Sequence, residues 1–524
     1  MIKEILEQNV DLQQLLFIRG FLVTNRSDIN ISEFPFYGNW DCIDVKGYHI
    51  FTHKKQNAYV YEQNNIAFFL IGHCLNPFDS LYNENDILKK IYERSNSPEE
   101  MFGYINQLTG SFLLGIIRDG NFEFLSDPSG MLFSCYGKIE DDIYISSHAQ
   151  LLGDLCGLKK GEYILRLEKY KHFYKYGLFF PGDLTQYDEF KRVLQNHVMS
   201  FNGEDFSYRR FYPCTNLKLV ETQVEYERLI ENVVNILRNT IALSIKKWDK
   251  IALSMTGGMD SKTTLACANG MYDELQFYSY ISMAGDKIDA DAAHKIANEI
   301  GIKHDIYEID ENDNAFENIE LFRAIIEHNN GGYTVNKNDV RKRYYFAQKK
   351  LFNVEIKSWI SEIARANYYK KFGTKKMPKH LSPRHMTSMY KIFTTQRSLV
   401  KATDVQFAKF INKTGFHKFP KGYDESDMYL WEFRYSAWGG MVITSEHSFS
   451  NEIFIPYNNR LLLDYMLSAP QEKRISDKFH EDIIKYANKK IDDCGITITN
   501  WNETKKRMYL EKIYFKVHSF FKGL

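Results

Sequence analysis

A short loop rich in glycine and hydroxyl side chains is the strongest chemical feature of this sequence. It reads Ser254-Met-Thr-Gly-Gly-Met-Asp-Ser261, and it lies between an apolar segment at 250–255 and a helical one. Backbone amides in such a loop, together with the positive end of a helix dipole, can hold an anion such as phosphate. Because Gly257 and Gly258 carry no Cβ, phosphate oxygens can approach the chain closely there.

Side chains of the same loop add donors and one charge. Ser254, Thr256 and Ser261 offer hydroxyl groups, and Asp260 offers a carboxylate. Asp260 would repel a phosphate unless a cation lay between them, so its position implies Mg²⁺. The alternative is a glycine-rich turn that binds no ligand. The acidic residue next to the glycines favours the metal-bound phosphate instead.

Two common nucleotide-binding motifs do not fit this loop. A Walker A loop requires Gly-Lys-Ser/Thr after four spacer residues, whereas Lys262 here follows Ser261. The Rossmann fingerprint G-x-G-x-x-G is absent as well. The loop is therefore a phosphate-binding candidate of a different class.

The segments around the loop indicate a parallel, doubly wound sheet. Apolar side chains recur at helical spacing from Gln223 to Ile245, and strands and helices then alternate. The expected order is strand 250–255, the loop, a helix from Lys262, strand 275–282, helix 289–301 and strand 304–310. Later segments are mostly helical, and 370–427 is basic and irregular, which predicts an insertion or a lid.

The first two hundred residues have a different character. Short apolar segments separated by Asn, Asp and Gly predict stacked sheets with some helix. The expected strands include 15–24, 66–75, 110–119 and 142–147, with a helix at 83–95. The change near Pro213 predicts two domains, 1–212 and 213–524.

The loop resembles a known family. Thr256-Gly-Gly-Met-Asp-Ser261 is similar to the SGGxDS pyrophosphate loop of the N-type ATP pyrophosphatases. The stretch Asp289-Ala-Asp-Ala-Ala293 and His304 narrow the resemblance to asparagine synthetase, β-lactam synthetase and lasso-peptide cyclase. The resemblance implies an adenine nucleotide alpha hydrolase-like domain that cleaves ATP between its α and β phosphates.

The same resemblance implies an adenine site and a second metal ligand. The backbone of Ile281, Ser282 and Met283 would contact adenine. The family motif G-x-G-x-D-E-x-x-G-G-Y corresponds to 358–368, where the glycines are missing and Glu362 takes the Asp position. A Glu supplies the same carboxylate oxygens, so Glu362 is predicted to bind Mg²⁺ with Asp260; the alternative is a glutamate that only complements a helix dipole.

The N-terminal half also resembles this family, and the resemblance implies an Ntn-hydrolase-like αββα sandwich. The matching segments are Ile71-Gly-His-Cys-Leu-Asn76, Leu108-Thr-Gly-Ser-Phe112, Ser126-Asp-Pro-Ser-Gly130 and Tyr144-Ile-Ser-Ser-His148. The glutaminase of that fold uses a cysteine exposed by removal of Met1, but Ile2 follows here. We therefore expect no glutamine hydrolysis, and we interpret Cys42 and Cys74 as buried thiols.

Acyl transfer to an amine requires a base and a cation. In β-lactam synthetase a Tyr–Glu pair and a late lysine fill these roles. The candidates here are Glu432 as base or as the residue that orients the base, in a segment that resembles the family's C-terminal helices, and Lys505 or Lys506 as the late lysine. The alternative for each is a solvated charge. In the same region, Asn458 stands where the family has Asp.

Composition limits the partners and the compartment. Lys+Arg and Asp+Glu both number 67, which argues against nucleic acid as a partner. No apolar run approaches the roughly 20 residues that span a bilayer, so stable membrane insertion is not expected. Seven scattered cysteines without a CxxC motif fit reduced thiols in a cytoplasmic protein. A homo-oligomer is compatible with the sequence.

Three functional hypotheses follow. The first is an AMP-forming amide ligase or cyclase that uses ATP and Mg²⁺, a small-molecule or peptide carboxylate and an amine acceptor, without glutamine. The second is an ammonia-dependent asparagine synthetase. The third is an inactive scaffold, which the altered 358–368 segment favours and the intact loop opposes.

Overall fold

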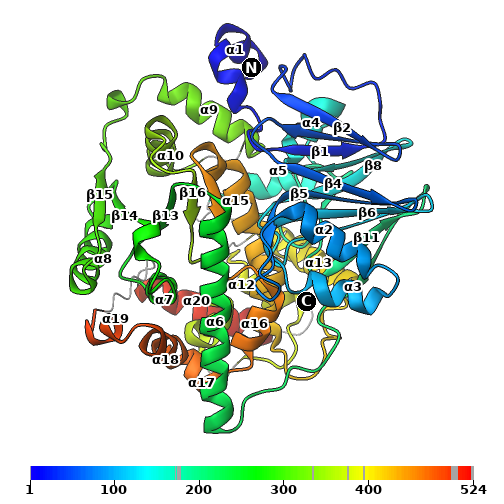
Figure 1. Cartoon of the computed structure of the whole chain (residues 1–524). Helices are drawn as coiled ribbons and strands as arrows, with labels where there is room; N and C mark the ends of the chain where they lie inside the picture. Colours follow the sequence, from blue (N-terminus) through cyan, green and yellow to red (C-terminus); the bar gives the residue numbers. More distant parts are fainter. Residues whose placement is uncertain are drawn as a thin grey trace.

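Three sheets form the framework of the chain (Figure 1). The computed structural model describes residues 2–171, 173, 179–332, 335–373, 377–392, 396–496 and 505–520. Two six-stranded antiparallel sheets belong to the N-terminal half, and a five-stranded parallel sheet belongs to the C-terminal half. The predicted α/β class with two packed sheets followed by a doubly wound sheet is therefore confirmed.

The two antiparallel sheets lie face to face with helices outside them, as an αββα sandwich requires (Figure 1). The first sheet runs β10 (Phe190–Arg192), β8 (Cys135–Ile139), β9 (Asp142–Ser146), β1 (Phe21–Thr24), β3 (Tyr48–His53) and β2 (Trp40–Val45). The second runs β12 (Phe206–Arg210), β11 (His197–Phe201), β7 (Asn121–Ser126), β6 (Thr109–Arg118), β5 (Ile66–Leu75) and β4 (Ala58–Gln63). The outer helices are α2 (Glu84–Glu93), α3 (Pro98–Ile105) and α4 (Ala149–Cys156).

Two expectations for this half need correction. The expected strand 15–24 begins only at Phe21, because 10–15 form a 3₁₀ helix and the Phe17 N–H donates to Asn329 of the C-terminal half. Cys74 is buried, but Cys42 is exposed. Cys42 lies on β2, the edge strand of its sheet, and most of that strand faces solvent.

The parallel sheet has the order β15 (His304–Glu308), β14 (Gln276–Ile281), β13 (Ile251–Ser254), β16 (Val354–Ile356) and β17 (Glu452–Phe454). From β13 the chain first builds outward through β14 and β15, and it then returns to the other side of β13 for β16 and β17. The order therefore reverses between β13 and β16. In open parallel sheets, ligands bind at such a switch point, outside the carboxyl ends of the strands.

Helices cover this sheet and continue to the C-terminus. Around the sheet lie α6 (Gln223–Lys247), α7 (Met259–Cys267), α8 (Asp286–Ile300), α9 (Ile319–Asn329) and α10 (Lys337–Lys349). The later elements are α11 (Asn367–Phe372), α12 (Pro383–Met389), α13 (Arg397–Thr414), α14 (Glu425–Tyr429), a π-helix (Leu430–Gly439), α15 (Gly440–Ser445), α16 (Arg460–Leu467), α17 (Gln471–Ile475), α18 (Lys478–Ala487), α19 (Lys489–Asp493) and α20 (Lys505–Phe520). None of the described helices is long and apolar enough to cross a bilayer.

The segment 370–427 is more regular than its composition suggested. It contains α12 and α13, which pack on each other, and α12 also packs on α20. The Ser382 side chain caps α12, and α13 buries an apolar face that includes Leu399 and Phe407. Helical packing against the rest of the chain thus replaces the irregular structure that we expected.

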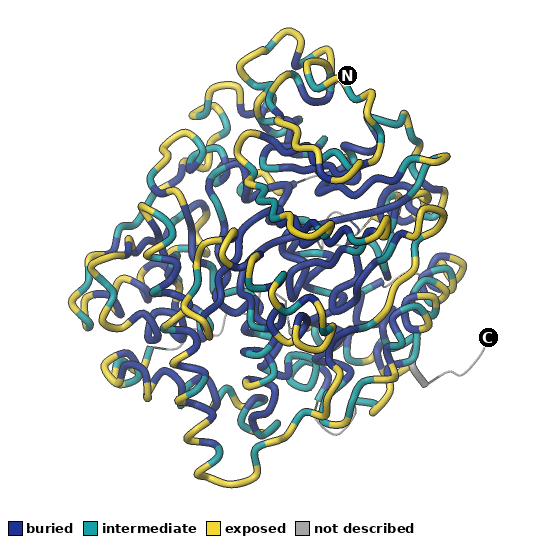
Figure 2. Tube along the Cα trace, turned by 45° about the vertical axis from the view of Figure 1, so that its right-hand side comes forward, coloured by how far each residue is buried: buried dark blue, intermediate teal, exposed yellow. Residues whose placement is uncertain are grey.

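The two halves share a continuous interior (Figure 2). The fully buried Asn458 donates to Gly110 O at 2.6 Å and to Asp127 Oδ1 at 2.8 Å. Burial raises the pKa of Asp127 above its usual value. An Asp at 458 would place a second carboxylate against Asp127. Asn458 avoids this repulsion, because its amide N–H donates to the Asp127 carboxylate.

Candidate active site

The glycine-rich loop connects β13 to α7 at the switch point of the parallel sheet. The strand ends at Ser254 and the helix begins at Met259. Inside the loop, the Thr256 N–H donates to Ser261 Oγ at 3.1 Å and the Gly258 N–H donates to Thr256 Oγ1 at 3.2 Å. The first-turn amides of α7 have no acceptor within the helix, so they can serve an anion.

A histidine on β15, two strands away from β13, supports this loop through Ser279 of β14. His304, which is buried, lies with Nε2 2.9 Å from Ser279 Oγ, and that hydroxyl donates to Met255 O at 2.7 Å. Burial, and then the nearby His294, lower the pKa of His304 to about 4, so the ring is neutral near pH 7. His304 therefore helps to position the loop, because it contacts the Ser279 hydroxyl that holds the Met255 carbonyl.

Asp260 faces residues that follow β16. Its Oδ2 accepts from Arg365 Nη1 at 2.5 Å, and its Oδ1 accepts from the Ser361 hydroxyl. Ser361 and Arg365 belong to η4, the 3₁₀ helix Ser361–Arg365. Because β13 and β16 are adjacent parallel strands, the loops after them meet at one edge of the sheet.

Two residues of the 358–368 segment have backbone conformations that glycine usually adopts, although the segment contains no glycine. Ile360 has φ 79° and Ala366 has φ 48°, both in the left-handed region. Such a conformation costs about 1–3 kcal/mol for a residue with a side chain, and a β-branched residue adopts it rarely. The segment therefore has an unusual turn whose free-energy cost the fully buried Ile360 helps to offset.

Glu362 belongs to η4, whose Ser361 and Arg365 contact Asp260, and its role as a metal ligand with Asp260 stays a prediction. Burial, and then the Asp260 charge, raise the pKa of Glu362 to about 7. The Tyr435 hydroxyl donates to Glu362 Oε2 and orients it. Tyr435 is a site residue that the sequence did not reveal, because it lies 73 positions away, on the π-helix.

Further charged residues complete the site. Arg365 Nε donates to Asp477 Oδ1 at 2.8 Å, and Lys370 Nζ donates to the same oxygen at 2.5 Å. His480 on α18 is fully buried, and neither ring nitrogen has a hydrogen-bond partner among the described residues. Burial lowers the pKa of His480 to about 4. The charged residues around Asp260 are thus the cations Arg365 and Lys370 and the acids Glu362 and Asp477. Of the residues in this site, the sequence analysis had named only Asp260 and Glu362.

Other predicted site residues lie in other environments. Glu432 is 2% exposed; its two oxygens accept from Arg210 at 2.5 and 2.9 Å, and Oε1 also accepts from Asn196 at 2.9 Å. These bonds involve both carboxylate oxygens, and a role for Glu432 as the base or as the residue that orients it stays a prediction. Lys506 is exposed on α20, and the Lys505 side chain lies outside the described residues.

The predicted adenine segment follows β14. The Ile281 carbonyl accepts the N–H of Ile309 at 2.8 Å, and the Ser282 N–H and hydroxyl both donate to Asp286 Oδ2, at 2.9 and 2.7 Å. Met283 is 42% exposed. Contact between adenine and this segment remains a prediction.

Comparison with known proteins adds little to this picture. No protein-family model and no curated protein sequence matches the chain. Among solved structures, the chain is similar to a glutamine phosphoribosylpyrophosphate amidotransferase from B. subtilis complexed with ADP and GMP, at 9% identity and a TM-score of 0.24, over 68% of this chain and 73% of that one.

Two further solved structures are similar at the same low level. An allosteric regulatory enzyme of purine biosynthesis matches at 12% identity and a TM-score of 0.24, over 56% of this chain and 60% of that one. A glutamine-dependent NAD⁺ synthetase from Acinetobacter baumannii in complex with ADP matches at 14% identity and a TM-score of 0.21, over 40% and 43%. Likenesses this weak carry no argument about activity, which must come from the residues of the site.

Proposed function

We propose that this chain is an ATP-dependent, AMP-forming amide ligase that activates a carboxylate as an acyl-adenylate and transfers the acyl group to an amine. The observation that carries the proposal is the contact between Asp260 and η4, the 3₁₀ helix that contains Glu362, at the switch point of the parallel sheet and next to the Thr256–Ser261 loop. A phosphate-binding turn and a pair of acids at that place suit a magnesium-bound triphosphate.

The residues present fit both ATP and Mg²⁺. Loop amides and the hydroxyls of Thr256 and Ser261 would hold phosphate oxygens, and the carboxylates of Asp260 and Glu362 would hold the ion. Mg²⁺ would neutralise the charge that builds up on the departing pyrophosphate. Arg365 would have to release Asp260 to the ion, and its guanidinium would then be free to bind a phosphate oxygen.

The proposed reaction has two steps. A carboxylate oxygen of the substrate attacks the α-phosphorus of ATP, the bond to the β-phosphate oxygen breaks, and pyrophosphate leaves. The amine then attacks the acyl carbon, the bond between that carbon and the phosphate oxygen of AMP breaks, and the nitrogen loses a proton. Tyr435 acts here as a positioning residue, because it holds Glu362 in place.

One observation favours the inactive scaffold as a second candidate. In the structure the positive charge opposite Asp260 comes from Arg365, which Asp477 also holds, so the site is neutralised without a metal. A scaffold would keep this ion pair permanently, whereas a ligase must open it.

Exchange of labelled pyrophosphate into ATP separates the two candidates. The assay should be run with Mg²⁺ and with pools of amino acids, peptides and other carboxylates, because adenylation is reversible. Exchange that depends on an added carboxylate and disappears in Asp260→Ala supports the ligase. Binding of Mg·ATP without exchange for any pool would support the scaffold instead.

A further inference from the structure

Two histidines and a glutamate from three separate segments converge in the helical part of the chain. His380 lies in the loop before α12, His417 lies in the loop after α13, and Glu425 is the first residue of α14. Nδ1 of His380 lies 2.8 Å from Glu425 Oε1, and Nδ1 of His417 lies 2.9 Å from the same oxygen. The ligand atoms that the three side chains offer lie within 4.8 Å of one another.

Glu425 is fixed in place and desolvated. Its side chain is 6% exposed, and Oε2 accepts the Leu381 N–H at 2.6 Å. A buried carboxylate is costly unless a positive charge compensates it. In the described part of the chain no lysine or arginine forms an ion pair with Glu425, and its two side-chain partners are imidazoles, which are common metal ligands.

We propose that His380, His417 and Glu425 bind a divalent transition metal of the Zn²⁺ type. Two imidazole nitrogens and one carboxylate oxygen suit Zn²⁺, whereas Mg²⁺ and Ca²⁺ prefer oxygen ligands. A tetrahedron with metal–nitrogen bonds of about 2.0–2.1 Å separates its ligand atoms by about 3.3 Å. The rings must therefore move away from Glu425 by roughly 0.5 Å.

The surroundings allow that movement and leave room for a fourth ligand. The side chains of His380 and His417 are 61% and 39% exposed, so both rings can shift, and water can complete the coordination. The metal would tie the loop before α12 to the start of α14. It would thereby fix α12 and α13 against the helical segment that continues into the π-helix carrying Tyr435. This inference does not depend on the proposed ligase activity.

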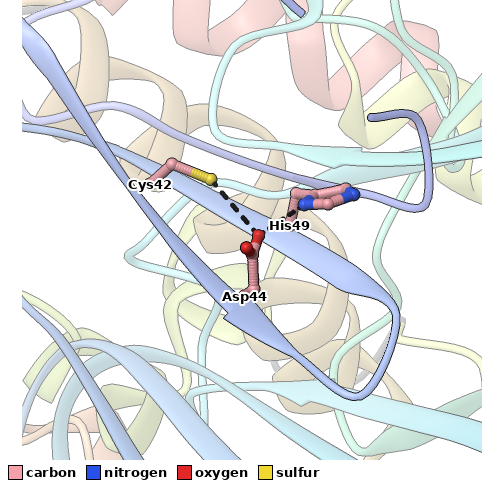
Figure 3. Close-up of side chains that lie close together, drawn as sticks. All are labelled: Cys42, Asp44 and His49. Atoms are coloured by element: carbon pink, nitrogen blue, oxygen red, sulfur yellow. Dashed lines mark hydrogen bonds and ion pairs between the residues drawn. The ribbon is translucent and has the colours of Figure 1, made fainter. Parts of the chain in front are cut away.

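A second cluster, in the N-terminal half, provides a matched control. Cys42, Asp44 and His49 lie on the hairpin of β2 and β3, and Figure 3 shows Asp44 between the other two side chains. His49 Nδ1 lies 2.5 Å from Asp44 Oδ1, but the Asp44 side chain is 76% exposed, so water already solvates its charge. Partial burial, and then the Asp44 charge, raise the pKa of the Cys42 thiol to about 11. His49→Ala thus removes a carboxylate-paired imidazole without affecting the proposed site.

Metal uptake by the full-length chain, after treatment with a chelator, tests the proposal. We expect the wild-type chain to bind Co²⁺ at this site with a visible ligand-field band, and to bind Zn²⁺ in equilibrium dialysis. His380→Ala and His417→Ala should each weaken this binding about 100-fold or more, because the loss of outer-shell partners alone costs about 10–100-fold. His49→Ala should bind as the wild type does.

The partial exposure of both rings makes the histidine variants safe for folding, and circular dichroism would verify this. A wild-type chain that shows no ligand-field band would overturn the proposal. An affinity that is unchanged in either His380→Ala or His417→Ala would overturn it as well, and the three residues would then be a hydrogen-bonded cluster only.

Discussion

Replacing Arg365 with methionine should destabilise the protein, because it removes the positive charge that Asp260 faces. Arg365 makes one bond to Asp260 at 2.5 Å and one to Asp477 at 2.8 Å. A hydrogen bond to a charged group contributes about 1.5–3 kcal/mol. The Arg365 and Asp260 side chains are each 19% exposed, so solvent reduces the effect. We expect the free energy of unfolding to fall by about 2–4 kcal/mol.

Thermal and urea denaturation would measure this change. For 524 residues the unfolding entropy is about 1.1 kcal/mol/K if the chain unfolds cooperatively, so Tm should fall by about 2–4 °C. Methionine keeps most of the side-chain volume, so the loss reflects charge more than packing. Lys370 still pairs with Asp477 in the variant, so Asp260 is the carboxylate that loses its ion-pair partner.

Mg²⁺ supplies the second part of this test. In the Arg365→Met chain, Mg²⁺ can take the place of the guanidinium next to Asp260, so it should raise the Tm of the variant more than that of the wild type. Arg26→Met, which removes an exposed ion pair with Asp28, should leave stability and its Mg²⁺ dependence nearly unchanged. If Arg365→Met behaved as Arg26→Met does, our account of the Asp260 environment would be refuted.

Three more substitutions test other parts of the account. Asn458→Asp should lower the free energy of unfolding in urea by about 3 kcal/mol or more, since a second carboxylate would face the buried Asp127; unchanged stability would contradict the contact. Burial, and then the Asp339 charge, raise the pKa of Glu446 to about 7, above its unfolded value of 4.5, so the folded chain binds this proton more tightly. The wild type should therefore lose stability relative to Glu446→Gln as pH rises from about 4.5 to about 7, by at most about 3 kcal/mol, and parallel urea-stability profiles would contradict this. Ala366→Gly should stabilise the chain by up to about 1 kcal/mol in urea, because it removes left-handed strain; a loss of stability would argue against that backbone conformation.

Local sequence patterns predicted the framework well. The continuous apolar run at 66–75 forms β5 with the expected bounds, and the helical periodicity from Gln223 predicted α6. The glycine and hydroxyl pattern at 254–261 correctly predicted a loop between a strand and a helix. In each case a single segment carries the information, because strand and helix periodicities arise from neighbours in the chain.

The rest of the site depends on contacts between distant segments. Arg365 reaches Asp260 across 105 positions and Asp477 across 112, and no local pattern marks these partners. The left-handed conformation at Ile360 has no signal in the sequence, because glycine is the residue that normally indicates it. The ion pair of Glu432 could not be predicted from a local pattern either, because its partner Arg210 lies in the other half of the chain.

Calorimetric titration with ATP in the presence of Mg²⁺ tests the central claim most directly. The account predicts that the wild-type chain binds Mg·ATP and that Asp260→Ala loses this binding, while circular dichroism shows that the variant remains folded. A wild-type chain that releases or absorbs no heat with Mg·ATP, or an Asp260→Ala variant that binds it equally well, would contradict the claim that this loop holds a magnesium-bound triphosphate.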